Sequence, residues 1–126
     1  MMSIALLLAL ASAAPEVPSS SVQVSQEGSA WVLRNLIDNN PLYTFDQDEP
    51  GKSNCDDACA ATWHPLLVFG SDQPVGQWTQ IRRADGSSQW ALRGMPVYSF
   101  AQDPEPVMAS NGKLGAWHVI APLPAP

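Results

Sequence analysis

The chain has 126 residues, of which six are Lys or Arg and twelve are Asp or Glu, so its formal net charge is −6. Nucleic-acid binding depends on a basic patch that neutralises phosphates, and this acidic balance argues against that class of partner. Twelve prolines and a charged fraction of only 14% favour short strands joined by turns, because proline interrupts helix interiors.

Residues 1–13 have the pattern of a secretory signal peptide. An apolar stretch from Ile4 to Ala11 leads into Ala11-Ser12-Ala13, the small-residue pattern that signal peptidase recognises, so we expect cleavage before Ala14. This stretch is shorter than the roughly 20 apolar residues that span a bilayer, and no later segment resembles a membrane span. The sequence therefore predicts export to the periplasm or the medium.

The rest of the chain is expected to form one domain between a leader and a tail. Residues 14–29 are rich in Pro, Ser and Gln, the composition of a flexible leader. Residues 123–126 form a Pro-rich tail. Residues 30–122 are long enough for a single domain with one modest core.

Residues 30–69 and 89–122 are predicted to be two copies of one unit. Eight of the ten aromatic residues and both histidines fall in matched positions, which leaves Phe69 and Trp78 unmatched. A fixed internal match of this kind indicates a tandem repeat. The matched segments are Trp31–Arg34 with Trp90–Arg93, Pro41–Asp48 with Pro96–Asp103, and Trp63-His64 with Trp117-His118.

The predicted fold is mainly β, with two pseudo-symmetric hairpin units packed into one small domain. Apolar and polar residues alternate in the unit centres, which is the period of a strand, and Asn, Asp and Gly mark the turns. We expect the units to pack through Trp31, Trp63, Trp90 and Trp117. The expected strands are 30–38, 42–45, 78–83, 89–93, 96–100 and 117–121, with turns at Asn39-Asn40, Asp85-Gly86 and Gly94-Met95.

One short helix is expected near residues 56–61. Ser53 and Asp56 have the spacing of a capping box, in which the serine side chain caps the first turn. Asp56 and Asp57 also suit the positive end of a helix dipole.

The repeated motif resembles that of a known family. Tyr43-x-Phe45-x-x-Asp48 and Tyr98-x-Phe100-x-x-Asp103 are similar to the signature of the bacterial secreted-repeat proteins, a family of predicted lipoproteins. The resemblance implies export and a repeat architecture, and it implies no established biochemical activity. This chain departs from the family pattern in lacking a lipidation Cys and in having Trp63-His64-Pro65 where the first repeat often has Trp-Pro-Pro. Further matching residues are Cys55, Cys59, Ala60, Gln89, Trp90, Pro96 and Trp117-His118-Val119.

Cys55 and Cys59 are the two cysteines of the sequence. Residues four apart share a helix face, and an oxidising compartment favours a disulfide, so we expect a local structural bridge. The alternative is a redox-active pair, since a cysteine near a helix N-terminus has a lowered pKa. The neighbouring Asp56 and Asp57 would oppose the thiolate and disfavour that alternative.

Residues 46–57 partly resemble a calcium loop. Asp46, Asp48 and Asp57 fall at ligand positions 1, 3 and 12, but Pro50 at position 5 has no side-chain oxygen. We therefore expect Asp48 and Asp103 to accept backbone hydrogen bonds in the turns that end their strands.

Two Trp-His dipeptides are the remaining candidates for a metal or haem site. In an extended segment neighbouring side chains point to opposite faces, so Trp63 and Trp117 are expected inside, and His64 and His118 outside. Two histidines are a small ligand set, and we expect ordinary surface residues.

The sequence contains no phosphate loop, nucleophile elbow or complete metal motif. Tyr43 and Tyr98, with the surrounding Trp residues, are expected to form the core; the alternative is that they line a groove for a glycan or peptide. We expect a non-enzymatic envelope or secreted module, binding or structural, without a cofactor, that contacts an envelope component or a small ligand. The alternative function is a periplasmic metal- or haem-binding protein.

Overall fold

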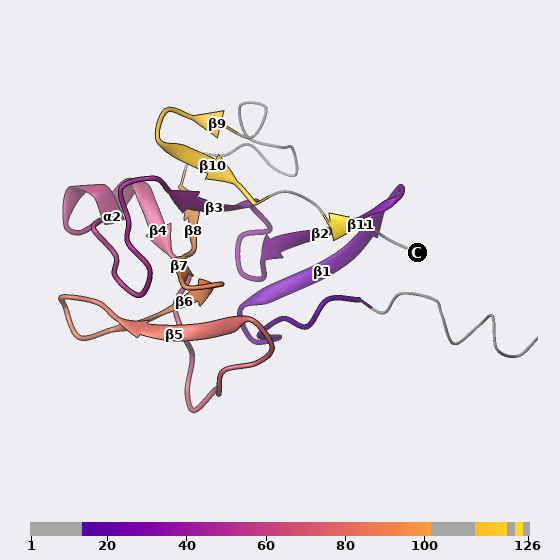
Figure 1. The fold of residues 1–126 in the computed structure, drawn as a ribbon, viewed down its shortest axis with the longest axis horizontal. Coiled ribbons are helices and arrows are strands. Elements are labelled where there is room, and N and C mark those ends of the chain that lie inside the picture. Colours follow the sequence, from indigo (N-terminus) through magenta and orange to yellow (C-terminus); the bar gives the residue numbers. More distant parts are fainter. Residues whose placement is uncertain (1–13, 102–112, 121–122, 125–126) are drawn as a thin grey trace, which may run out of the picture.

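The computed structural model describes residues 14–101, 113–120 and 123–124 (Figure 1). Within them the chain is mainly β, as the sequence predicts, with three small antiparallel sheets and one short helix. The predicted signal peptide, residues 1–13, and the motif residue Asp103 lie outside the described residues.

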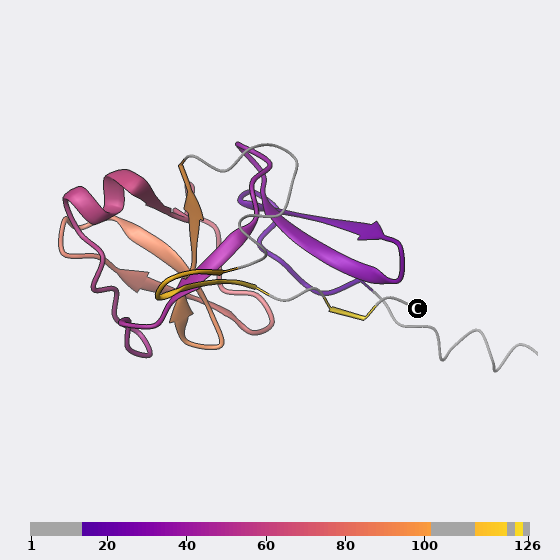
Figure 2. The ribbon, with the colours of Figure 1, turned by 90° about the horizontal axis from the view of Figure 1, so that it is seen from above.

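The first sheet contains a hairpin that the sequence analysis missed. β1 (Val22–Glu27) pairs along its whole length with β2 (Ala30–Asn35) through a turn at Gly28, and β11 (Leu123–Pro124) pairs with the other edge of β2. Figure 2 shows this hairpin, in indigo and purple, extending away from the rest of the protein. The prediction of a flexible leader over residues 14–29 is therefore wrong for β1, where Val22 and Val24 alternate with polar residues and pack on the core.

The second sheet is the corresponding hairpin of the second repeat, with a short third strand. β5 (Trp78–Arg82) pairs with β6 (Ser88–Leu92), and β6 pairs with β7 (Met95–Pro96). Leu92 pairs with Met95, so the turn consists of Arg93 and Gly94 rather than the predicted Gly94-Met95. Both turn residues have positive φ, 53° and 89°, which is the turn type that matches the twist of a hairpin.

The third sheet joins the two repeats. Its order is β4 (Trp63–Pro65), β8 (Tyr98–Phe100), β3 (Leu42–Phe45), β10 (Trp117–Val119) and β9 (Lys113–Leu114). The central pair consists of equivalent strands, β3 and β8. Each of them takes its other neighbour from the opposite repeat, so β4 of the first repeat lies beside β8, and β10 of the second lies beside β3.

The register of this sheet confirms the internal repeat. The equivalent residues Tyr43 and Tyr98 face each other across the central pair. On one side Trp117 faces Phe45, and on the other side Trp63 faces Phe100, so the two flanking pairs are also equivalent. The repeats are thus related by a pseudo-twofold axis between β3 and β8, and they exchange their last strands.

The apolar residues form two clusters. In the one at the pseudo-axis, the rings of Trp63 and Trp117 stack with their centroids 3.9 Å apart, and Phe45 and Phe100 extend the stack at the two ends. The predicted contact between the units through these two tryptophans is confirmed. Trp90 instead belongs to the second cluster, and Trp31 is only half-buried. The second cluster consists of Val22, Leu33, Leu42, Leu66, Trp78, Trp90 and Val97.

The helix α2 (Ala58–Thr62) begins two residues later than predicted. Its N-cap residue, Asp57, has a φ of 53° and makes no side-chain capping hydrogen bond. The predicted capping box is wrong because Ser53 and Asp56 bond elsewhere, as described below.

Candidate functional site

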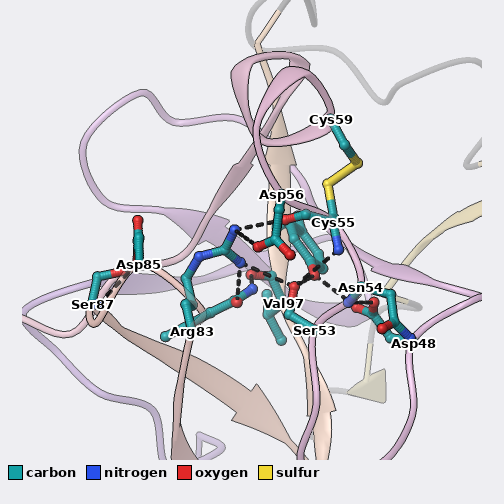
Figure 3. A network of polar contacts seen from close by, with 12 residues as sticks. Asp48, Ser53, Asn54, Cys55, Asp56, Cys59, Arg83, Asp85, Ser87 and Val97 are labelled. Carbon is teal, nitrogen blue, oxygen red and sulfur yellow. Dashed lines mark hydrogen bonds and ion pairs between the residues drawn. A yellow bond between two sulfur atoms is a disulfide. The ribbon is translucent and has the colours of Figure 1, made fainter.

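A buried polar network begins at Asp48, one of the two aspartates of the repeated motif (Figure 3). Its Oδ1 accepts the backbone N–H of Asn54 at 2.6 Å, and its Oδ2 accepts the hydroxyl of Tyr98 at 2.7 Å. The backbone bond agrees with the turn role predicted for Asp48. The bond from Tyr98 was not predicted, and it connects the motif aspartate of the first repeat to the motif tyrosine of the second.

The network runs from Asp48 to the guanidinium of Arg83. Tyr98 gives its one hydroxyl proton to Asp48, so the hydroxyl of Ser53, 2.5 Å away, donates to Tyr98. The oxygen of Ser53 in turn accepts from Nη1 of Arg83 at 3.0 Å. All bonds in this chain point from the cation to the carboxylate, an order in which each bond polarises and strengthens the next.

Arg83 itself is 6% exposed, and both of its terminal nitrogens donate hydrogen bonds. It donates to the side chain of Gln89 at 2.8 Å, to the carbonyl of Cys55 at 2.6 Å and to the carboxylate of Asp56 at 3.2 Å. Figure 3 shows the Arg83 side chain reaching toward Cys55 and Asp56. It therefore holds the loop before α2 against the second repeat, and these contacts explain why Asp56 does not cap the helix.

Burial raises the pKa values of two side chains in this network. It raises the pKa of the Asp48 carboxyl above its ordinary value, an effect that outweighs the hydrogen bonds from Asn54 and Tyr98. Burial also raises the pKa of the Tyr98 phenol far above its ordinary value, so the phenol stays protonated and available as a donor. The bond between Tyr98 and Asp48 is thus a structural contact of the core.

The structure contains the expected disulfide. Cys55 and Cys59 are bonded, with their Cα atoms 5.2 Å apart. Cys55 is fully buried, and its backbone N–H donates to Ser53. The disulfide therefore joins the start of α2 to the Arg83 network.

The structure separates the candidate metal ligands. Asp46 Oδ2 accepts a hydrogen bond from the imidazole of His118 at 2.8 Å. Asp48 faces Tyr98 instead, and Asp57 is exposed at the start of α2. His64 lies on the edge strand β4 and His118 on β10, with β8 and β3 between them. Among the described residues, no group of three or more His, Cys, Asp or Glu side chains could hold a metal ion.

The motif aromatics lie in the core rather than in a groove. Tyr43 and Tyr98 are fully buried, and Trp63 and Trp117 are 8% and 7% exposed. Each tyrosine ring meets a tryptophan edge-on, Tyr43 against Trp63 and Tyr98 against Trp117. Their contact with a ligand would require opening of the core.

A groove of about 400 Å³ lies elsewhere, between the β2–β3 turn and the segment that follows β4. Ile37 and Asp38 form one wall, Leu67 and Phe69 form the other, and His64 lies between them. Three of its apolar residues are exposed: Ile37 by 74%, Phe69 by 41% and Leu67 by 37%. The groove is therefore an exposed apolar site with two ionisable side chains.

Hydrogen bonds fix the first wall of the groove. The side chain of Asn35 accepts the N–H of Ile37 at 2.8 Å, and Asp38 accepts the N–H of Asn40 at 2.9 Å. Asp38 also accepts the hydroxyl of Ser99 at 3.4 Å. This wall holds Ile37 outward rather than allowing it to fold into the core.

The second wall is fixed by the β6 and β8 region. The N–H of Leu66 donates to Val97, the carbonyl of Leu66 accepts from Trp90, and the N–H of Val68 donates to Ser88. These backbone hydrogen bonds of Leu66 and Val68 hold the segment in place, with Leu67 and Phe69 exposed to solvent.

Sequence reasoning missed this groove, although two signals pointed to it. Phe69 is one of the two aromatic residues without a counterpart in the other repeat. Leu36-Ile37 is an apolar pair within a polar turn, and the second repeat has the two-residue turn Arg93-Gly94 at that place. All the residues that line the groove therefore belong to the first repeat.

A second hollow, of about 530 Å³, lies beside α2. Asp56, Asp57 and Asp85 line it together with Arg83. Because the terminal nitrogens of Arg83 donate to protein groups, the charged groups that this hollow exposes to solvent are mainly carboxylates.

Comparison with known proteins identifies the family. A family model described as "secreted repeat of unknown function" matches residues 37–67 and again residues 79–121. No curated protein and no solved structure is detectably similar to the chain. Within the described ranges, no helix combines the length and the apolar character that crossing a membrane requires. The family match covers more than half of the sequence and falls on both repeats, and the chain therefore belongs to this secreted-repeat family.

Proposed function

We propose that this protein is an exported, non-enzymatic binding module of the envelope or medium, and that the groove beside Ile37 and Phe69 is its binding site. The observation that carries the proposal is the exposure of Ile37 and Phe69 on two facing walls. Apolar groups gathered in a concave surface mark ligand or partner sites, whereas single exposed apolar residues are common. Asp48 and Tyr98, whose pKa values burial raises, are bonded to each other in the core and do not line the groove, which supports a binding role for the groove over a catalytic one.

The groove suits a small apolar group. Its volume, about 400 Å³, is at the low end of the range of ligand sites. Full burial of a side chain such as Ile contributes roughly 1.5–3 kcal/mol, and Ile37 is 74% exposed. A ligand that covers it should gain most of that free energy, which corresponds to about a tenfold change in affinity.

Binding of the neutral dye Nile red, followed by its fluorescence, tests the proposal. We expect the wild type to bind the dye, and Ile37→Ser and Phe69→Ser to raise the dissociation constant by about tenfold. Leu36→Ser is the matched control, because Leu36 is 45% exposed but does not line the groove. Thermal melting checks that each variant is folded.

A wild type that does not bind the dye would contradict the proposal. Equal losses of binding in Leu36→Ser and Ile37→Ser would contradict it as well, because the dye would then be responding to general surface hydrophobicity.

A further inference from the structure

We infer that the ligand of the groove is a peptide segment of a partner protein, in which an apolar side chain stands next to a Lys or Arg. The inference rests on the proposed function and extends it to a chemical class. The apolar side chain would lie between Ile37 and Phe69, and the cation would pair with Asp38.

Asp38 is available for such a partner. It is partly exposed, and each of its carboxylate oxygens accepts one hydrogen bond, from Asn40 and from Ser99. A carboxylate accepts about four hydrogen bonds in all, so Asp38 can still accept from a ligand. It forms no ion pair with the described cationic side chains.

Apart from the imidazole of His64, the described part of the groove contains no side chain that could compete for Asp38 as a cation. No Lys or Arg side chain of the described residues lines it. Arg34, in the strand that leads to the groove, is 7% exposed and is paired with Glu27 at 3.5 Å. A cationic ligand would therefore meet Asp38 without displacing an internal partner.

The charge of the whole chain favours the same ligand. A net charge of −6 attracts cations over a Debye length and repels anions. It also disfavours an anionic lipid surface, which attracts basic rather than acidic proteins. A second copy of the chain would bring the same net charge and another Asp38 toward the site, so a cationic peptide fits better than self-association.

Three blocked dipeptides separate charge from apolar contact. Each has leucine first, followed by lysine, glutamine or glutamate, and binding is followed by NMR chemical shifts at low salt. We expect the lysine peptide to bind roughly fivefold more tightly than the glutamine peptide, which is the upper range for an exposed ion pair. The glutamate peptide should bind most weakly.

Asp38→Asn is the decisive variant, because the amide oxygen can still accept the N–H of Asn40 and the amide NH2 can donate to the hydroxyl oxygen of Ser99. It should bind all three peptides as weakly as the wild type binds the glutamine peptide. Glu49→Gln removes an exposed charge of the same sign outside the groove and should preserve the preference for lysine.

Different outcomes of these experiments would contradict different parts of the inference. Equal binding of the three peptides by the wild type would overturn the inference about charge and leave the apolar site intact. A preference for lysine that survives in Asp38→Asn would overturn the role of Asp38. Failure of every peptide together with Nile red would reject the groove itself. A concentration-dependent dimer that Ile37→Ser dissociates would show that a second copy occupies the groove, and would overturn the peptide assignment.

Discussion

Replacement of Asp48 tests whether the motif aspartate acts through hydrogen bonding in the core or through its charge. Asp48→Ala removes the acceptor of the Tyr98 hydroxyl and of the Asn54 N–H. The loss of partners by buried polar groups costs roughly 1–3 kcal/mol. In a domain of this size that cost lowers the melting temperature by about 4–12 °C.

Asp48→Asn should cost less than about 1 kcal/mol, because the amide keeps one acceptor oxygen and removes a buried charge. Tyr98 can then keep its acceptor, and the N–H of Asn54, an exposed residue, can bond to water. The difference between the Ala and Asn variants therefore measures the hydrogen bonds rather than the charge.

The pH dependence of the two proteins gives an independent check. Because the folded pKa of Asp48 is raised above the ordinary value of 3.8, its contribution to stability is fully present below pH 3.8 and is lost as the pH rises through the folded pKa. The Asn variant has no such group, so its stability relative to the wild type should increase between pH 3.5 and 7.

Thermal melting monitored by circular dichroism across this pH range measures both effects. The reasoning is refuted if Asp48→Asn is as unstable as Asp48→Ala and if its deficit grows toward neutral pH. A rise in melting temperature of the wild type on adding calcium, abolished in Asp48→Asn, would show that the carboxylate serves an ion.

Three further predictions concern export, the disulfide and the stacked core. Protein recovered from the medium or envelope should begin at Ala14, and an intact mass that retains the first thirteen residues would disprove cleavage there. Native protein should contain no alkylatable thiol. Reduction of Cys55–Cys59 should lower the free energy of unfolding by at most about 2 kcal/mol, because a short closed loop restricts the unfolded chain little. A larger loss, measured by urea unfolding, would show that the disulfide stabilises the fold by more than this loss of chain entropy. Trp63→Ala should lower the free energy of unfolding by about 3–5 kcal/mol. Trp31→Ala, at a half-buried position, should lower it clearly less. Equal losses in the two variants would argue against the stacked core.

The sequence predicts the strands and turns because both depend on local chemistry. The alternation in 42–45 matches β3 residue for residue, and Asp85-Gly86 lies in the loop that joins β5 and β6. The composition of residues 14–29 indicates a flexible leader, but the alternation of Val22 and Val24 with polar residues is the pattern of the strand β1. The alternation predicts this strand better than the composition does, because two valines on one face of a strand are enough to pack it on the core of a small domain.

The exchange of strands between the repeats is not predictable from the sequence. β3 and β8 are equivalent, so β4 satisfies the same pattern of faces whether it pairs within its repeat or with the other one. The observed register places Trp63 opposite Phe100 rather than Phe45. For the same reason the sequence gives the backbone role of Asp48, and not its bond to Tyr98.

The groove could not be located from the sequence because apolar residues in a pattern indicate burial by default. Ile37 lies within the predicted strand 30–38, where an apolar residue is expected to be buried, whereas the observed strand β2 ends at Asn35. Its exposure results from the turn held by Asn35 and Asp38, and its partner wall, at Phe69, is set by pairing with the second repeat.

Chemical-shift mapping of the assigned protein with the leucine–lysine peptide tests the central claim most directly. The account predicts that the largest shifts fall on the amides of Ile37, Asp38, Leu67 and Phe69, and that the corresponding turn of the second repeat, Arg93-Gly94, is unaffected. Shifts concentrated instead along the acidic hollow beside α2, or spread evenly over both repeats, would contradict the assignment of the groove as the binding site.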